Sequence, residues 1–243
     1  MAEQLFLLPG WGLGCAPLEP LHAALREEMP EVPVTIAPLP SLASADPRDW
    51  LDELDAKLPQ DVWLGGWSLG GMLAAELAAR RGARCRGLIT LASNLCFVAR
   101  ATWPAAIQVE TFAAFRQGCA ADAGATLKRF SLLCAQGAAQ PRELSRQLLA
   151  AAPQTPSAEL LAGLDVLVAL DTRAALGGFT GPQLHLFAGQ DALVPAAASH
   201  ALRALSASAE VRLIDRVSHA FPLECPSLTA AAIQALIGEG AND

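Results

Sequence analysis

The sequence predicts an α/β fold: a mainly parallel sheet flanked by helices, with a helical cap inserted between two of its strands. Two observations predict it. Short apolar runs alternate with helical patterns over the first 92 residues and again from residue 183 onward. Between these regions strand signals are absent, and one amphipathic helical pattern follows another. We therefore expect a core of residues 1–96 and 175–243 and a cap of residues 97–174.

The expected strands are short apolar runs bounded by Gly, Pro or polar residues. The first starts close to the N-terminus and ends at Pro9-Gly10. The third lies directly before an Ala-rich helix, the order typical of a strand–helix unit in a parallel sheet. In chain order we expect strands at residues 5–8, 34–37, 62–65, 87–92, 183–188 and 210–214. Outside the cap we expect helices at residues 18–28, 49–58, 69–80 and 228–237.

Within residues 97–174 the helical patterns are separated by residues that break helices or begin them. These residues are Pro104, Gly118, Gly124, Gly137, Pro141, Pro153 and Pro156. A helical block of this kind between two strands is typical of a cap over the edge of a sheet.

The composition indicates one folded domain. The chain has 243 residues, of which 53% are hydrophobic and 17% charged, enough for a sizeable core. No apolar run approaches the roughly 20 residues of a membrane-spanning helix. The N-terminus lacks the basic and apolar regions of a signal peptide, so we expect a cytoplasmic protein without a membrane partner. The six cysteines are scattered and no nucleotide motif occurs, so neither a metal ion nor another cofactor is expected.

Charge is distributed unevenly along the chain. The formal net charge of −7 argues against binding to nucleic acid, because a phosphate backbone requires a basic surface. Within the cap, however, residues 116–146 hold five basic and two acidic side chains, a local charge of +3. The basic residues are Arg116, Lys128, Arg129, Arg142 and Arg146.

The candidate nucleophile is Ser68, in the sequence GWSLG at residues 66–70. This sequence fits the motif Gly-x-Ser-x-Gly and joins the expected strand at 62–65 to the expected helix at 69–80, the context that gives the motif its meaning. The serine backbone is strained in such an elbow, so small residues must flank it. Gly71 and the two glycines of the motif meet this need. The turn exposes the hydroxyl at a helix N-terminus, where negative charge is stabilised.

A serine hydroxyl needs a base within reach to act as a nucleophile. The chain has four histidines. His22 falls in the expected helix at residues 18–28 and His185 in the expected strand at residues 183–188, while His200 lies within a further helical pattern that has a polar face. Packing or solvation explains these three. His219 lies in the loop after the last expected strand, where a sheet displays catalytic groups. We therefore expect His219 to be the base.

The orienting acid is expected to precede the histidine in the chain order Ser, acid, His. Asp191 meets this condition, since it follows the expected strand at residues 183–188. A carboxylate there can hold one ring nitrogen of His219 and stabilise the imidazolium. Asp215, at the end of the next expected strand, is the alternative acid.

An oxyanion hole requires two backbone N–H donors around the developing charge. Leu69, the residue after the nucleophile, is expected to supply one. The second is expected from the loop after the first strand, where Gly10 and Gly12 allow close approach of the backbone. We expect the backbone N–H of Trp11 to be this second donor. We also expect the Trp11 indole to form part of the wall of the acyl pocket.

Five stretches of the sequence are typical of one enzyme family. They are LPGWGL at residues 8–13, WLGGWSLGG at residues 63–71, ASNLCFVARATWP at residues 92–104, and the segments around Asp191 and His219. In them the chain resembles the bacterial pimeloyl-acyl-carrier-protein methyl ester esterases of biotin synthesis, and the run at residues 92–104 is much more specific to this family than the others. The resemblance covers nearly the whole chain and implies the α/β-hydrolase fold and a serine carboxylesterase. The family usually has His where this chain has Pro9, and an additional N-terminal β-hairpin.

The resemblance also implies site residues and a partner. Family members contact the acyl group through residues that match Phe130, Ser131, Leu132, Leu133 and Cys134. We expect Trp11, Ser68, Leu69 and His219 to contact the substrate as well. They dock an acidic acyl carrier protein on cap arginines, which match Arg129, Arg142 and Arg146. Arg142 and Arg146 are four residues apart and so share a helix face. We expect a monomer that acts on an ester carried by acyl carrier protein.

Three other functions would each require a different set of residues or substrates. A broad-specificity carboxylesterase for short acyl esters would use the same three catalytic residues. A non-catalytic binding protein with a hydrolase fold is expected to lack one of them, and none is lacking here. Haloalkane or epoxide cleavage would require an aspartate at the position of Ser68.

Overall fold

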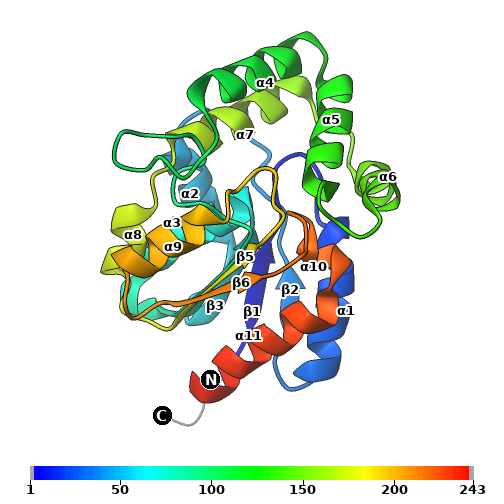
Figure 1. The fold of residues 1–243 in the computed structure, drawn as a ribbon. Coiled ribbons are helices and arrows are strands. Elements are labelled where there is room, and N and C mark those ends of the chain that lie inside the picture. Colours follow the sequence, from blue (N-terminus) through cyan, green and yellow to red (C-terminus); the bar gives the residue numbers. More distant parts are fainter. Residues whose placement is uncertain (1–2, 241–243) are drawn as a thin grey trace.

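A single sheet of six strands forms the centre of the protein, whose computed structural model describes residues 3–240. The strand order is β2-β1-β3-β4-β5-β6 (Figure 1). Every pairing between these strands is parallel, so the predicted fold class is confirmed. The strands are β1 (Leu5–Leu8), β2 (Val34–Ile36), β3 (Val62–Trp67), β4 (Cys85–Leu91), β5 (Gln183–Ala188) and β6 (Glu210–Ile214).

Two inner strands of the sheet, β3 and β5, are buried along their whole length. All six residues of β3 and all six of β5 are buried, as expected for parallel strands covered by helices on both faces. β5 and β6 have the predicted bounds. β3 extends two residues beyond the predicted end and stops at Trp67. The strand therefore runs directly to the candidate nucleophile.

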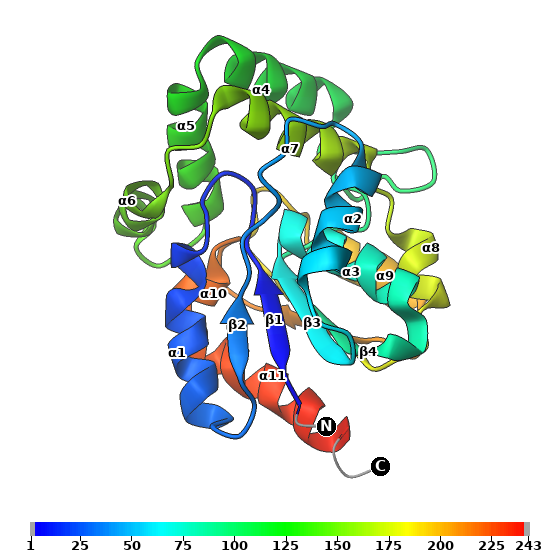
Figure 2. The ribbon, with the colours of Figure 1, turned by 180° about the vertical axis from the view of Figure 1, so that it is seen from behind.

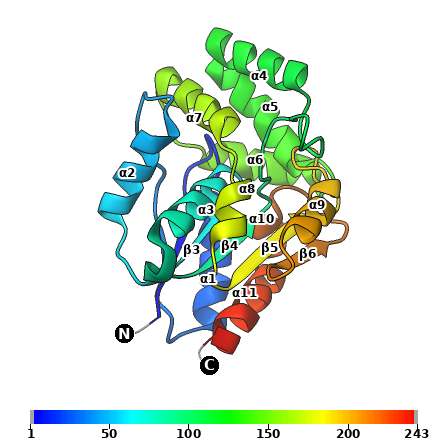
Figure 3. The same ribbon diagram turned by 90° about the vertical axis from the view of Figure 1, so that its left-hand side faces the viewer.

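Helices cover the two faces of the sheet in separate groups (Figures 2 and 3). Helices α1 and α11 pack against each other on one face. On the other face α3 is the central helix, and α2 and α8 pack against it. The covering helices are α1 (Glu19–Glu28), α2 (Pro47–Lys57), α3 (Leu69–Arg81), α8 (Arg173–Gly178), α9 (Ala197–Leu205), α10 (Phe221–Glu224) and α11 (Pro226–Gly240). Within residues 3–240 no helix is both long enough and apolar enough to cross a membrane.

Four further helices lie over one end of the sheet (Figure 1). They are α4 (Val109–Ala121), α5 (Ala123–Ala135), α6 (Pro141–Ala151) and α7 (Ser157–Ala169). Asp122 separates α4 from α5, and its side chain caps α5 by accepting a hydrogen bond from the Ala125 N–H at 2.9 Å. Pro141 begins α6, where a missing N–H costs nothing. The expected boundary at residues 174 and 175 falls inside α8, which packs on the core helix α3.

Hydrogen bonds hold the two segments of chain that connect this helical block to the sheet. The side chain of Asn94 accepts a hydrogen bond from the Trp103 indole at 2.9 Å. The backbone N–H of Thr172 donates to the carbonyl of Leu95 at 2.9 Å. The run at residues 92–104 thus forms the stem of the block, which explains why this run contains Asn and Trp.

An ion pair reinforces the same stem. Asp171 contacts Arg173 at 2.6 Å and Arg100 at 3.4 Å. The hydrogen bond from Arg173 is the main cause that lowers the pKa of Asp171 to about 2. Asp171 is therefore charged at neutral pH and joins the two ends of the block.

Candidate active site

The turn between β3 and α3 places Ser68 in a strained conformation. Its backbone has φ of 56° and ψ of −119°, the left-handed side of conformational space that residues other than glycine rarely adopt. Two hydrogen bonds hold it there. The Ser68 N–H donates to the Leu91 carbonyl at 2.8 Å, and the Ser68 carbonyl accepts from the Ser93 hydroxyl at 2.8 Å. Strain that neighbours sustain in this way is typical of an active site.

The glycines around Ser68 allow this turn to pack tightly. A Cβ added to Gly66 would lie 2.2 Å from the carbonyl carbon of Gly70, and one added to Gly70 would lie 2.4 Å from the Leu8 carbonyl oxygen. Neither position has room for a side chain, because the neighbouring atoms are backbone. The predicted need for small residues follows from these contacts.

Asp191 and His219 form a buried pair. Asp191 Oδ2 lies 2.8 Å from His219 Nδ1, and both side chains are fully buried. The other carboxylate oxygen accepts two backbone N–H groups, from Leu193 at 2.8 Å and Val194 at 2.9 Å. These donors orient the carboxylate toward the imidazole. The alternative acid, Asp215, is exposed.

The second nitrogen of the His219 ring is the one available for chemistry. Nε2 is buried and has no hydrogen-bond partner within residues 3–240. The carbonyl of His219 accepts a hydrogen bond from the Trp67 indole at 2.9 Å, and the two rings lie 5.7 Å apart. Trp67 is the residue before Ser68, so this contact fixes the base beside the elbow. No hydrogen bond joins Ser68 to Nε2 in the described residues; in enzymes without substrate this bond is often long.

The other three histidines lie outside the candidate site, either packed within the fold or exposed to solvent. His22 contacts Glu19 and the Val34 carbonyl, and His200 is exposed on α9. His185 is buried in β5, with Nδ1 2.7 Å from the Thr90 hydroxyl. Burial lowers the pKa of His185 to about 3. His185 is therefore neutral in the folded protein at neutral pH.

Replacing His185 by glutamine is expected to flatten the pH dependence of stability. The unfolded chain binds a proton near pH 6.5, whereas folded His185 binds one only near about pH 3. Stability from the neutral ring is thus present above pH 6.5 and is lost as the pH falls toward 3, by up to ~1.4 kcal/mol per pH unit. Urea unfolding at pH 7, 5 and 4 measures this slope. His200→Gln is the exposed control, and an unchanged slope in His185→Gln would contradict the assignment.

Two backbone N–H groups lie free at the elbow. No hydrogen bond within residues 3–240 uses the N–H of Trp11 or of Leu69. The loop carrying Trp11 approaches the nucleophile closely, since a Cβ added to Gly10 would lie 3.5 Å from the Ser68 Cβ. The arrangement is suited to bind a developing oxyanion.

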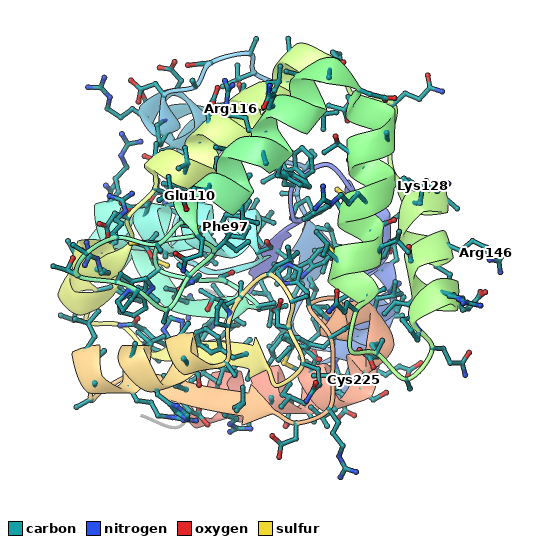
Figure 4. All side chains as sticks on the ribbon, turned by 45° about the horizontal axis from the view of Figure 1, so that its top comes forward. Phe97, Glu110, Arg116, Lys128, Arg146 and Cys225 are labelled. Atoms are coloured by element: carbon teal, nitrogen blue, oxygen red, sulfur yellow. The ribbon has the colours of Figure 1, made fainter. Side chains whose placement is uncertain are left out.

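A cavity of about 540 Å³, including its open mouth, leads to Ser68. Its walls are apolar apart from Ser68, Thr111 and Arg129. Side chains of α4, α5 and α7 form most of these walls. Phe97, labelled in Figure 4, contributes from the stem and packs edge-on against Phe112 of α4. A cavity of this size and character fits an acyl chain.

Trp11 connects the loop beside Ser68 to the helices that form the cavity walls. Its indole N–H donates to the Leu160 carbonyl of α7 at 2.8 Å. The ring packs edge-on against Phe115 and Phe130. Gly163 makes room for it, because a Cβ there would lie 2.8 Å from the indole. Trp11 therefore forms a wall of the cavity.

Only part of the expected acyl-binding stretch lines the cavity. Phe130 and Leu133, three residues apart on α5, are among the lining residues. Ser131 and Cys134 are fully buried on other sides of the helix, and Leu132 is 51% exposed. A helix presents only one face to a cavity. Within residues 130–134, Phe130 and Leu133 are therefore the two that line the cavity. Leu69 and His219 are buried near Ser68 but are not lining residues.

The basic residues of the helical block differ in their pairing. Arg116 is bound by Asp165 of α7 through two hydrogen bonds. Arg146 is paired with Glu143 at 2.7 Å on the exposed surface of α6. Figure 4 shows Lys128 and Arg146 extending outward on the same side.

Two of the expected docking residues are not paired. Arg129 and Arg142 are exposed, and neither forms an ion pair with another group in residues 3–240. Arg129 also lines the cavity. The mouth of the cavity thus lies beside exposed positive charge.

Several contributing residues were not foreseen from the sequence. Trp67 occupies a variable position of the serine motif, and Ser93 is the second residue after the end of β4. Glu224 accepts hydrogen bonds from the backbone N–H and the hydroxyl of Ser218 at 2.9 and 2.8 Å. No local pattern marks Glu224. Within residues 3–240, no group of three or more His, Cys, Asp or Glu side chains could hold a metal ion.

Comparison with known proteins agrees with the fold. The model of the alpha/beta hydrolase family matches residues 5–232, so the chain belongs to this family. Among solved structures, an esterase from Exiguobacterium antarcticum superposes with a TM-score of 0.82 at 16% identity, covering 98% of this chain and 92% of the esterase. A bromoperoxidase from Bacillus anthracis gives a TM-score of 0.80 at 19% identity, covering 100% and 93%.

Relatives in sequence place the chain more narrowly. It is 36% identical over 249 residues to a pimeloyl-[acyl-carrier protein] methyl ester esterase from Aromatoleum aromaticum, covering 96% of this chain and 98% of the relative. It is also 36% identical to the biotin biosynthesis bifunctional protein BioHC of Cellvibrio japonicus, covering 95% of this chain but only 46% of that longer protein. Within the hydrolases, the chain belongs to the pimeloyl-[acyl-carrier protein] methyl ester esterase family.

Proposed function

We propose that this protein hydrolyses the methyl ester of pimeloyl-acyl carrier protein in biotin synthesis. The observation that carries the proposal is the buried pair of Asp191 and His219, 2.8 Å apart, beside a strained serine at the end of an apolar cavity. The names of the relatives support the substrate. A cytoplasmic, monomeric enzyme without a nucleic-acid partner is part of the proposal.

The proposed reaction has two steps. Ser68 Oγ attacks the ester carbonyl carbon and passes its proton to His219 Nε2, while Asp191 stabilises the imidazolium. The backbone N–H groups of Trp11 and Leu69 bind the oxyanion. The imidazolium then protonates the departing methoxide, and methanol leaves. A water molecule, deprotonated by His219, then attacks the acyl-enzyme. As the acyl–oxygen bond breaks, the imidazolium returns the proton to Ser68 Oγ, and the carboxylic acid leaves as the free carboxylate.

The helical block is proposed to receive the carrier protein. We assign residues 97–174 as the cap and Arg129, Arg142 and Arg146 as its docking residues. Exposed positive charge next to the cavity mouth supports this assignment, since an acidic carrier is attracted to it. The apolar cavity would then receive the acyl chain.

Replacing Arg129, Arg142 and Arg146 by Glu is expected to lower kcat/KM for carrier-bound ester by about 10- to 100-fold at low salt. Salt screens such charges, so the wild-type advantage should fade at high ionic strength. Hydrolysis of a small free ester should fall much less, because Arg142 and Arg146 do not line the cavity and Arg129 is the one exchanged residue that does. Steady-state kinetics with both substrates measures the difference.

The matched control reverses three charges far from the cap. Arg26, Arg84 and Arg212 are exposed on the core, and their replacement by Glu changes the net charge equally. Equal losses in both triple variants would assign the effect to net charge. No loss with either substrate, together with failure to complement a strain lacking the biotin-pathway esterase, would favour a broad-specificity carboxylesterase.

A further inference from the structure

One carboxylate connects the loop of the catalytic base to the cap. Glu224 ends α10, five residues after His219. Its Oε2 accepts the N–H and hydroxyl of Ser218 at 2.9 and 2.8 Å. Its Oε1 accepts the backbone N–H of Ala139 at 3.3 Å. Ala139 belongs to the connection between α5 and α6. We call this connection, together with the last two residues of α5, the cap corner (residues 134–140).

The cap corner also contacts the loops of both the acid and the base. The carbonyl of Cys134 accepts the N–H of Ala220 at 3.1 Å. Gly137 has φ of 94°, and a Cβ there would lie 2.5 Å from both the Cβ and the carbonyl oxygen of Gln190. Gln190 precedes Asp191. In Figures 1 and 2 the lower end of α5 reaches α10, and Figure 4 labels Cys225, the residue after Glu224.

The backbone around His219 is therefore bound at three consecutive residues. Ser218 is held by Glu224, the His219 carbonyl by Trp67, and the Ala220 N–H by Cys134. Two of these three attachments involve the cap corner: Cys134 belongs to it, and Glu224 binds it through Ala139. Catalytic groups must be held to within about 0.5 Å of their productive positions, so release of these attachments affects the imidazole directly.

We propose that Glu224 is a positioning residue that sets the geometry of His219 by tying the base loop to the cap corner. The inference rests on the proposed function only in taking Ser68 and His219 as nucleophile and base. The cap is thus a part of the support of the base as well as a cover for the acyl cavity.

Variants separate the two attachments of Glu224. Glu224→Ala removes both and is expected to lower kcat for a small free ester by about 10- to 100-fold with little change in KM. In Glu224→Gln the amide oxygen can still accept from Ser218, but its NH₂ faces the Ala139 N–H. One attachment is lost, and kcat should fall by less than about tenfold.

A second variant moves the cap corner and leaves Glu224 intact. Gly137→Ala introduces a Cβ against Gln190, so we expect kcat to fall with KM again little changed. Gly82→Ala is the matched control: Gly82 also has positive φ, but a Cβ there meets nothing within 4 Å. It should lower the melting temperature and leave kcat unchanged. An equal loss of kcat in Gly82→Ala would overturn the proposal.

A fluorophosphonate probe reports the reactivity of Ser68 independently of acyl binding. We expect the labelling rate to fall in the same order as kcat, with Glu224→Ala slowest, in variants whose melting temperatures show them folded. Labelling of Glu224→Ala or Gly137→Ala at the wild-type rate would overturn the role of the cap corner. Absence of labelling at Ser68 in the wild-type protein would instead remove the proposed function itself.

Discussion

Ser68→Ala is expected to lower kcat for ester hydrolysis by about 10⁴- to 10⁶-fold, the loss typical of a triad serine. Without the hydroxyl no acyl-enzyme forms, and water must attack directly. The fold should persist, because the Ser68 contacts that hold the turn use its backbone N–H and carbonyl. Alanine can also occupy the elbow, although its backbone is strained there as serine is.

The measurement is turnover of a short ester together with mass spectrometry of the acylated protein. Ser206→Ala is the control, since Ser206 is a buried serine at the end of α9, distant in sequence from the elbow and absent from the cavity lining. It should retain activity. Near-native turnover by Ser68→Ala would remove the central assignment.

Asp191→Asn is expected to leave a folded protein with kcat lowered by about 10⁴-fold. The two N–H groups of Leu193 and Val194 need an acceptor, so the amide oxygen of Asn should turn to them. Its NH₂ then faces His219 Nδ1 and donates to it. The ring proton is placed on Nε2, and Nε2 can no longer accept the proton of Ser68.

Kinetics of Asp191→Asn and Asp215→Asn distinguish the two possible acids. The first should lose turnover and the second retain it, because Asp215 is exposed while Asp191 contacts the imidazole. Full activity in the first variant and none in the second would show that the acid was assigned wrongly.

Sequence patterns predicted what depends on local order. The strands are apolar runs with clear ends, so β5 and β6 were placed with their exact bounds. Asp191 and His219 each follow a strand, and the ends of parallel strands meet at one edge of the sheet. The order of strands and loops in the sequence was therefore enough to predict that these two side chains lie together, and the structure has them 2.8 Å apart.

What the sequence did not reveal depends on contacts between distant segments. Glu224 and Ala139 are 85 residues apart in the chain, and no periodicity relates them. The face of α5 that meets the cavity is another example. The sequence match covers residues 130–134 but does not show which of these side chains point into the cavity. The packing of α5 against α4 and α6 decides this, and it places Phe130 and Leu133 in the cavity wall.

The two ends of the proposed cap lie close together, so we expect the segment between them to be exchangeable. The Leu95 carbonyl and the Thr172 N–H are 2.9 Å apart, so a foreign insertion with neighbouring ends can be grafted between them without stretching the sheet. The graft must, however, bring its own acceptor for the Ala220 N–H. We therefore expect chimaeras chosen for substrate range alone to be folded but slow, and those that also retain residues 134–140 to keep their turnover.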